Sequence, residues 1–454
     1  MSYRSKCLIA IASLFGALLM PAACVFAQAI QPVPDLRKSV EFLAMIDHGD
    51  FEGALAHASP ALRAALPATK LAETWTAVTQ QVGPCQPLGA PVIQFRDGHP
   101  LIVAAMPCAV MSLELLIGVD GAGAIAGFHI APAARTSDAT FEANEHFVEA
   151  AINVGPAARA LGATLTLPRG DGPFAGVVLV HGSGPHDRDE TLGPNKPFVN
   201  LAHDLARHGI AVLRYDKRTW SRPGDFAGGQ FTVDDELVND AVAAAEVLRQ
   251  SPHIDPGRIV VAGHSLGALM APRIAQRAPW IAGAVLLAAP ARPLQDIVVD
   301  QRRYLAELDG GVDATERAEI AELEHQRDEI NKLDPQHPPT HPLMLRLPAT
   351  YWADLRAYDP VALAKMLPTP LLILQGARDY QVRPAQELVL WRRAFSDTKR
   401  VRIIEYATLS HIFETGSEPP GPSDYAQAGH VDTQVSTDIA NWIDQLPAGA
   451  TTSP

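Results

Sequence analysis

A serine between two glycines, Ser265 in the stretch Gly263-His-Ser-Leu-Gly267, is the residue of this chain best placed for nucleophilic chemistry. The β-branched run 258–262 before it predicts a buried strand, and the run 268–277 after it has helical spacing. A strand, a Gly-x-Ser-x-Gly turn and a helix form a nucleophile elbow, which lifts a serine hydroxyl clear of a sheet at a helix N-terminus. The glycines are needed because side chains in so tight a turn would collide with the neighbouring strand and helix.

An aspartate and a histidine follow the serine in the order that one form of acyl transfer uses. A hydroxyl attacks a carbonyl usefully only if a neighbouring base takes its proton and an acid orients that base. Asp379 stands just past the strand-like run 371–375, and His411 follows the strand-like run 401–406 by a short loop. Open α/β sheets gather their functional groups at the carboxyl ends of such strands. The order Ser265, Asp379, His411 therefore predicts a nucleophile, an orienting acid and a general base.

An acyl-transfer site also needs hydrogen-bond donors for the negative charge that develops on the carbonyl oxygen. The stretch His181-Gly-Ser-Gly-Pro185 ends an early strand, and its small residues allow backbone N–H groups to approach a substrate closely. We expect the backbone N–H groups of Ser183 and Leu266 to form this oxyanion hole. The alternative for the stretch is an ordinary glycine-rich turn between a strand and a helix.

From about residue 141 onward, strand-like runs alternate with helical runs, the pattern of a mostly parallel sheet with helices on both faces. An insertion at about 290–367 interrupts the alternation with an acidic helical run and a proline-rich stretch. Because it follows the strand after the nucleophile, it predicts a helical lid over the site. Tyr351 and Trp352 near its end are candidates for a substrate pocket, with core packing as the alternative. The eight strand candidates are 146–154, 163–167, 176–181, 210–215, 258–263, 283–289, 371–375 and 401–406; the helical runs are 198–208, 234–250, 265–277, 313–333 and 435–446.

These motifs give residues 141–446 a resemblance to the α/β-hydrolase superfamily. Within it, the chain is similar to exported bacterial esterases grouped with the serine-aminopeptidase-like and acyl-thioesterase-like hydrolases. The resemblance implies an α/β-hydrolase fold, with Ser265 as nucleophile, His411 as general base and Asp379 as its orienter. It implies no particular substrate, because one fold hosts many chemistries. The matching stretches are 181–189, 213–218, 263–267, 375–379 and 410–411.

Other polar residues near the motifs are interpreted as structural. His264, beside the nucleophile, is expected to pack or to form a hydrogen bond rather than to react. The charged residues 187–189 are expected to order the oxyanion loop by local ion pairs, with substrate contact as the alternative. His337 and His341 have the spacing of a metal pair, but they lie in a proline-rich loop without a matching acid or cysteine, so no metal site is predicted.

Residues 34–132 predict a small α+β domain ahead of the hydrolase-like region. Helical runs precede four short strands, and no catalytic cluster is found among them. This order resembles the NTF2-like accessory domains attached to some exported hydrolases. The stretch 131–140 is typical of a linker. The helical runs are 35–56 and 60–81, and the strands are 91–95, 101–106, 112–119 and 125–130.

The first residues predict export. Two basic residues precede an apolar run, 8–20, that is too short to span a bilayer comfortably, and a small-residue cleavage pattern ends at Ala27. We expect residues 1–27 to be a signal peptide and the mature protein to be periplasmic or secreted. Cys24 leaves open a lipoprotein alternative. No later segment is long and apolar enough to be a transmembrane segment.

Cys85 and Cys108 are the cysteines that remain after such cleavage. They flank two strand-like runs joined by a tight turn, and a hairpin returns its far ends to about one strand spacing from each other. An oxidising compartment then favours a disulfide between them. Two buried free thiols are the alternative.

The chain has 454 residues, of which 47% are hydrophobic, and its formal charge is −13. The length suggests two domains, and the charge argues against nucleic acid or an anionic membrane as a partner. Together the features predict an exported serine hydrolase that cleaves small-molecule carboxylic esters through an acyl-enzyme, without a cofactor. An aminopeptidase or an acyl thioesterase is the alternative within the enzyme class. A binding protein with an inert hydrolase domain is the alternative outside it.

Overall fold

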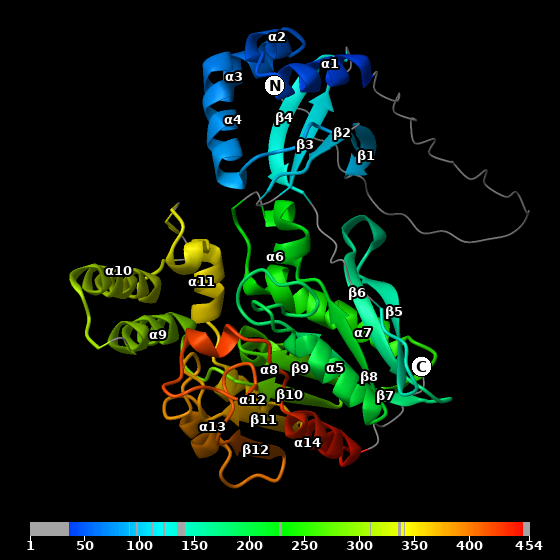
Figure 1. Cartoon of the computed structure of the whole chain (residues 1–454), viewed down its shortest axis with the longest axis vertical. Helices are drawn as coiled ribbons and strands as arrows, with labels where there is room; N and C mark the ends of the chain where they lie inside the picture. Colours follow the sequence, from blue (N-terminus) through cyan, green and yellow to red (C-terminus); the bar gives the residue numbers. More distant parts are fainter. Residues whose placement is uncertain are drawn as a thin grey trace, which may run out of the picture.

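The computed structural model describes residues 36–447, apart from 90, 97–98, 110–111, 121–122, 134–140, 227–228, 309, 335–336 and 340. Two sheets organise these residues, a four-stranded one with the order β1-β2-β3-β4 and an eight-stranded one with the order β12-β11-β10-β9-β7-β8-β6-β5. Figure 1 shows them in two bodies, the smaller in blue and cyan and the larger in green to red. The predicted signal peptide, with Cys24, and most of the predicted linker lie outside the described residues.

The smaller body packs short helices against an antiparallel sheet. Both predicted helices are interrupted in the structure. In the first, Gly49, with a positive φ of 78°, lies between the helical segments 36–47 and 51–56. In the second, Pro67, which has no N–H to donate, lies between the segments 60–65 and 68–82. The helices are α1 (Leu36–Asp47), α2 (Phe51–Ala56), α3 (Pro60–Ala65) and α4 (Ala68–Val82); the strands are β1 (Val92–Arg96), β2 (His99–Met106), β3 (Leu113–Val119) and β4 (Ile125–Pro132).

A disulfide joins Cys85 and Cys108 in this body, as the sequence predicts. The two cysteines form an isolated antiparallel bridge just beyond the paired strands β1 and β2. Their side chains pack against the buried cluster that includes Phe42, Ile46 and Leu115. The bond therefore ties the open end of the hairpin to the core of the smaller body.

Reducing this disulfide should lower the melting temperature of the smaller body and leave hydrolytic turnover at moderate temperature nearly unchanged. The bond closes a loop with a sequence separation of 23 residues, for which lost chain entropy in the unfolded state gives about 3 kcal/mol of stabilisation. The residues with predicted chemistry all belong to the other body. The measurement compares unfolding curves and turnover with and without reductant. Two free thiols in the denatured, unreduced mature protein would contradict the bond.

The larger body is built on the eight-stranded sheet. Strands β7 to β12 are parallel, whereas β6 runs antiparallel to both β5 and β8. All eight predicted strands are present, and the sheet has the mostly parallel arrangement expected of an α/β-hydrolase fold. The strands are β5 (Phe147–Val154), β6 (Leu161–Pro168), β7 (Phe174–Val180), β8 (Ile210–Tyr215), β9 (Ile254–His264), β10 (Gly283–Leu287), β11 (Leu371–Gly376) and β12 (Val401–Tyr406).

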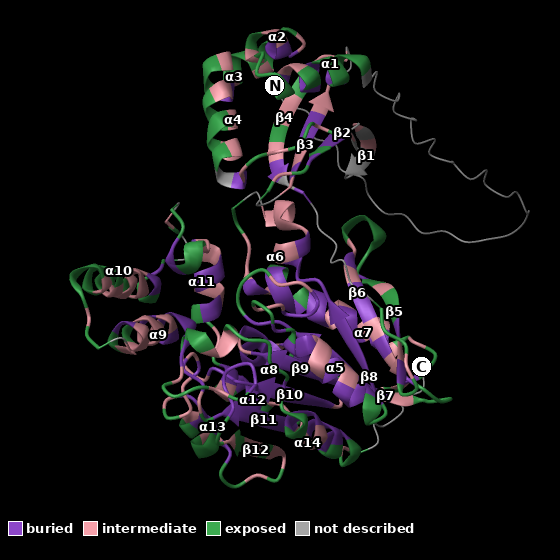
Figure 2. Ribbon diagram, in the orientation of Figure 1, coloured by how far each residue is buried: buried purple, intermediate pink, exposed green. Residues whose placement is uncertain are grey.

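Helices cover both faces of this sheet. Along β7, Val178 and Val180 pack into the cluster on the side of α7 and α8, and Val177 and Leu179 pack into the cluster on the side of α5 and α14. Burial on both faces explains why the central strands are nearly continuous hydrophobic runs. Figure 2 shows these strands mostly in purple, the colour of buried residues. The helices are α5 (Pro197–Arg207), α7 (Asn239–Arg249), α8 (Leu266–Arg277), α13 (Leu388–Ala394) and α14 (Thr433–Asp444), with the shorter elements η1 (Ala157–Arg159), α6 (Arg218–Ser221), η2 (Pro223–Phe226), η3 (Asp234–Val238) and η5 (Pro422–Tyr425).

The predicted insertion lies between β10 and β11 and is mainly helical. The acidic helix expected there begins after Asp313, whose side chain accepts a hydrogen bond from the backbone N–H of Glu316 in a capping box. Figure 1 shows α9 and α10 side by side at the flank of the larger body, with α11 nearer its centre. Within the described residues, no helix combines the length and the apolar character needed to cross a bilayer. The elements are α9 (Leu294–Leu308), α10 (Ala314–Asn331), η4 (Met344–Arg346), α11 (Ala349–Arg356) and α12 (Pro360–Met366).

Candidate active site

Ser265 lies at the turn between β9 and α8. Its backbone has φ 53° and ψ −112°, outside the regions that side-chain-bearing residues prefer. The flanking glycines allow the turn to close: a Cβ on Gly263 would meet the Gly267 carbonyl oxygen at 2.2 Å, and one on Gly267 would meet the Val180 oxygen of β7 at 2.2 Å. The sequence motif therefore forms the strained strand–turn–helix elbow that was predicted from it.

Asp379 and His411 lie side by side at the carboxyl edge of the sheet. Nδ1 of His411 is 2.8 Å from Oδ2 of Asp379, and both side chains are buried. The backbone N–H groups of Gln381 and Val382 donate to Oδ1 of Asp379, each at 2.8 Å. The side-chain amide of Gln375 donates to Oδ2 at 2.9 Å. These four contacts fix the carboxylate, which can then hold the imidazole in one orientation and one tautomer.

His264, the neighbour of Ser265, links the elbow to the loop that carries His411. Its Nε2 is 3.0 Å from the backbone carbonyl oxygen of His411, and the two ring centroids are 4.6 Å apart. Among the described residues, the structure records no hydrogen bond between the Ser265 hydroxyl and the His411 imidazole. In substrate-free hydrolases this contact is often long and tightens only in the complex with substrate. The geometry thus brings the predicted acid and base together, and His264, the residue before the serine, contacts the loop that carries the base.

The loop after β7 carries the first of the two predicted oxyanion donors. Ser183 from this loop and Leu266 from the elbow both line one cavity of about 440 Å³. Leu266 is the first residue of α8, where N–H groups have no acceptor within the helix and the helix dipole favours negative charge. A Cβ on Gly182 would lie 3.3 Å from the Cβ of Ser265, so the loop passes close to the predicted nucleophile.

The same loop is held from both sides by buried charged groups. The ammonium group of Lys217 donates to the carbonyl oxygens of Gly182 and Gly184, at 2.8 and 2.9 Å. On the opposite side, the backbone N–H of Gly182 donates to Oε1 of Glu190 at 2.6 Å. Sequence reasoning gave neither residue this contact. The available signals were the position of Lys217 two residues after a strand and its place in the matching stretch 213–218.

The expected local ion pairs around residues 187–189 are present. Arg188 binds Asp216 through Nε, Nη2 and its backbone N–H, and Asp189 forms an ion pair with Arg214. All four side chains are buried. They therefore order the segment that follows the oxyanion loop and leave no charge free for substrate.

The two aromatic residues proposed for the pocket have different positions. Tyr351 lines the 440 Å³ cavity, and its hydroxyl donates to Oε2 of Glu236 at 2.5 Å. Trp352 is not among the residues that line this cavity. Its ring is fully buried in the core, and its Nε1 donates to the carbonyl oxygen of Met344. Consecutive residues of a helix point about 100° apart, so α11 presents only the tyrosine to the cavity.

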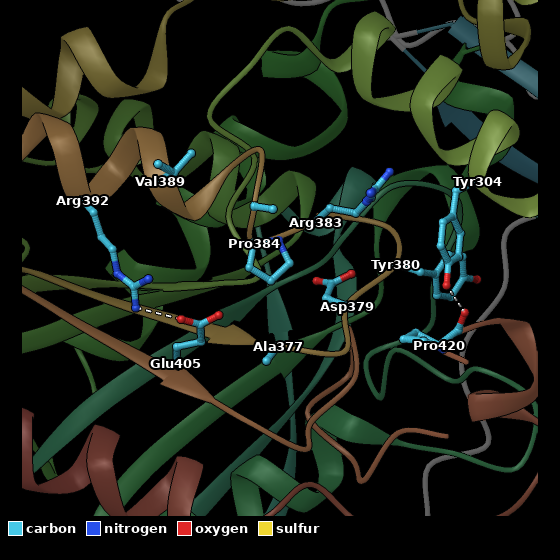
Figure 3. A pocket seen from close by; sticks show the side chains of 11 residues that line it. Tyr304, Ala377, Asp379, Tyr380, Arg383, Pro384, Val389, Arg392, Glu405 and Pro420 are labelled. Atoms are coloured by element: carbon cyan, nitrogen blue, oxygen red, sulfur yellow. Dashed lines mark hydrogen bonds and ion pairs between the residues drawn. The ribbon is translucent and has the colours of Figure 1, made fainter. Parts of the chain in front are cut away.

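A second cavity, of about 500 Å³, lies behind the acid (Figure 3). Asp379 reaches its wall, but both carboxylate oxygens are already bonded to His411 and to backbone and amide donors. Tyr304 of α9 stacks against Tyr380, with ring centroids 6.0 Å apart, and the guanidinium of Arg383 lies over the Tyr304 ring. These contacts join the insertion to the loop that carries Asp379.

Within the described residues, no group of three or more His, Cys, Asp or Glu side chains is placed to hold a metal ion. His337 and His341 each contact a separate acid. Nδ1 of His337 is 2.8 Å from Asp334, and Nε2 of His341 is 3.1 Å from Glu329. The histidine pair thus belongs to a solvated loop.

Comparison with known proteins places this arrangement among hydrolases. A family model described as serine aminopeptidase, S33, matches residues 171–415, which include Ser265, Asp379 and His411. Esterase EstD of Thermotoga maritima is 34% identical over 404 residues, which cover 88% of this chain and 93% of that protein. A match of that length extends well into the N-terminal body.

Solved structures similar to this one include esterases. Est1E from Butyrivibrio proteoclasticus is 18% identical, covers 65% of this chain and 98% of its own, and has a TM-score of 0.43. An esterase of Pyrococcus furiosus is 14% identical, covers 69% of this chain and 98% of its own, and has a TM-score of 0.42.

Proposed function

This chain belongs to the serine aminopeptidase S33 family of α/β-hydrolases, and from that premise we propose that it hydrolyses carboxylic esters with Ser265, His411 and Asp379 as its catalytic triad. The observation that carries the proposal is the 2.8 Å contact between His411 and Asp379 beside the elbow of Ser265. The similarity to an esterase over most of both chains supports the ester as substrate class.

In this mechanism the Ser265 hydroxyl attacks the ester carbonyl carbon while Nε2 of His411 takes its proton. The carbonyl oxygen becomes negatively charged and accepts hydrogen bonds from the backbone N–H groups of Ser183 and Leu266. The histidine returns the proton to the leaving alcohol, and the acyl group stays on the serine. Water then attacks the acyl-enzyme while His411 takes its proton, and the carboxylic acid product leaves Ser265. Asp379 stabilises the imidazolium that forms in both halves.

The 440 Å³ cavity favours an apolar acyl group over an aminoacyl group. Leucine side chains make up much of its lining, with Leu294, Leu345 and Leu347 contributed by the insertion. Glu236 is the one acid among its described lining residues. Its Oε1 is 2.9 Å from the ammonium group of Lys217, and its Oε2 accepts the Tyr351 hydroxyl. The carboxylate is therefore already paired, and a substrate α-ammonium group would find no free acid in this cavity.

We expect alkanoyl esters to be hydrolysed with a kcat/KM at least about 100-fold above that of aminoacyl amides. Placing an ammonium group in an apolar cavity without a free acid costs several kcal/mol, whereas an alkyl chain gains from burial there. The measurement is a panel of p-nitrophenyl esters of graded acyl length, matched thioesters and aminoacyl p-nitroanilides, each repeated with Ser265→Ala as the blank. Faster cleavage of the anilides would replace the esterase proposal with an aminopeptidase. An absence of both turnover and fluorophosphonate labelling would indicate a binding protein.

We further propose that residues 1–27 are removed on export to the periplasm or the medium. The basic residues, apolar run and small-residue pattern of this segment support cleavage after Ala27. The disulfide between Cys85 and Cys108 supports an oxidising destination. N-terminal sequencing of the protein made from the full-length gene should begin at Gln28. A chain that begins at Met1 would contradict export, and a lipidated Cys24 would make the protein a lipoprotein.

A further inference from the structure

A second acid–imidazole pair lies beneath the proposed triad. Oε2 of Glu190 is 3.0 Å from Nδ1 of His264, and the exposed fractions of the two side chains are 1% and 7%. Burial by itself would raise the pKa of the Glu190 carboxyl, but His264 and the neighbouring imidazoles lower it to about 2. Burial would likewise lower the pKa of His264, and the carboxylate of Glu190 outweighs this and raises it. The two side chains therefore form a close acid–imidazole pair in the interior of the protein, in which each group favours the charged form of the other.

This pair contacts each part of the proposed catalytic machinery through a different atom. Oε1 of Glu190 accepts the backbone N–H of Gly182, the residue before the oxyanion donor Ser183. His264 precedes Ser265 in the chain, and its Nε2 contacts the backbone carbonyl of His411. The oxyanion loop, the elbow and the histidine loop come from three distant segments of sequence, and the pair spans all three.

The backbone at Glu190 is also unusual. This residue has φ 51°, a left-handed conformation that a non-glycine residue adopts only when its surroundings demand it. Its neighbours hold it there: the backbone N–H donates to the carbonyl of Asp187, and the preceding Asp189 is fixed by Arg214. Local strain at a buried acid whose side chain faces a reactive centre is typical of a functional position.

We propose that Glu190 and His264 are positioning residues, which set the oxyanion loop and the loop of His411 at their working distances from Ser265. The inference rests on the proposed function, because it assigns to these two residues the alignment of that same site. Neither residue touches the reacting atoms. Their effect should therefore fall on the chemical step, where a displacement of about 1 Å can cost on the order of 100-fold, and only weakly on substrate binding.

The first test compares two replacements of the acid. Glu190→Gln keeps an oxygen for the N–H of Gly182 but removes the charge that holds His264, and we expect kcat to fall about 10-fold. Glu190→Ala removes both contacts, and we expect a fall of about 100-fold. KM should stay within about 3-fold for both variants. Because acylation uses the same alignment, the rate of labelling by a fluorophosphonate should fall by the same factor as kcat/KM.

Asp204→Asn is the matched control. Asp204 of α5 is also a buried acid; its Oδ1 accepts from Nη1 of Arg207 at 2.7 Å, and its Oδ2 lies 4.0 Å from Nδ1 of a histidine, His430. Within the described residues, its side chain has no hydrogen bond or ion pair with the oxyanion loop, the elbow or the loop of His411. We expect this variant to lose thermal stability and to keep the kcat of the unmodified enzyme. If Asp204→Asn slowed turnover as much as Glu190→Gln at equal loss of stability, the positioning role would be overturned.

A double variant tests whether the two residues act as one unit. If they do, Glu190→Gln combined with His264→Ala should be about as slow as the slower of the two single variants. Losses that multiply would show independent roles and would overturn the pairing. Unchanged kcat in Glu190→Ala would overturn the inference altogether and leave the esterase proposal standing. Failure of the esterase proposal itself would be seen separately, as an unmodified enzyme that is inert toward every ester of the panel.

Discussion

Replacing Ser265 with alanine should reduce ester hydrolysis to background, a loss of roughly 10³-fold or more, while the fold stays intact. The change removes only Oγ, the atom proposed to attack the ester. The strained turn has φ 53°, and both residues carry a Cβ, so the substitution adds no new clash at the elbow. His411→Ala should be similarly severe, because it removes the imidazole proposed to take the proton of Ser265. The measurement is turnover of the preferred ester, with fluorophosphonate labelling as a direct count of the reactive serine.

The control for this result is Ser221→Ala, which removes the hydroxyl of a buried serine in α6. It should keep both turnover and labelling. Retained labelling in Ser265→Ala would show that another residue is the nucleophile. Lost labelling together with a large fall in melting temperature would indicate damage to the fold and would have to be resolved with Ser265→Cys, which keeps a nucleophilic atom in place.

The sheet of the larger body was predictable because most of its strands are buried on both faces. The first four residues of β11, 371–374, are all hydrophobic, which is the pattern of a strand buried on both faces. The elbow was predictable for a different reason. A side chain at Gly263 or Gly267 would collide with backbone, so glycines at these two positions indicate the tight turn itself. Chain order then placed Asp379 and His411 at the same edge.

Helix boundaries and the insertion were less predictable because their determinants lie outside local periodicity. Gly49 and Pro67 divide two apparently continuous helices of the smaller body. Helix α9 was not predicted, although it supplies Tyr304 to the contact with the loop of Asp379. Trp352 is of a residue type common in pockets, but the orientation of α11 about its axis directs its side chain into the core.

The charged groups that hold the oxyanion loop show a further limit of sequence reasoning. Lys217 and Glu190 contact the same glycine from opposite sides, yet they come from separate segments. Lys217 lies in the matching stretch 213–218 and Glu190 just after the stretch 181–189, and neither stretch indicated this contact. A single sequence gives the residue types but not which buried charges meet. His264 could be assigned a hydrogen bond in general terms, whereas its partners, Glu190 and the carbonyl of His411, required the fold.

Replacing Asp379 with asparagine should slow ester hydrolysis by roughly 10²- to 10⁴-fold. The backbone N–H groups of Gln381 and Val382 both point at Oδ1, so the amide oxygen of an asparagine must take that position. The amide nitrogen then replaces Oδ2 and faces Nδ1 of His411, 2.8 Å away in the native protein. Two N–H groups cannot bond to each other, so Nδ1 must give up its proton and Nε2 must hold it.

A histidine with its proton on Nε2 cannot accept the proton of Ser265, which is why a nearly isosteric change should be so costly. The loss should appear in kcat, with KM nearly unchanged, because the substrate cavity does not include His411 or Asp379. Asp204→Asn is the control, since it alters another buried carboxylate, one that contacts Arg207 on α5. That variant should keep its turnover. If Asp379→Asn retained near-native rates, a different acid would have to orient His411, and the assignment of the triad would be wrong.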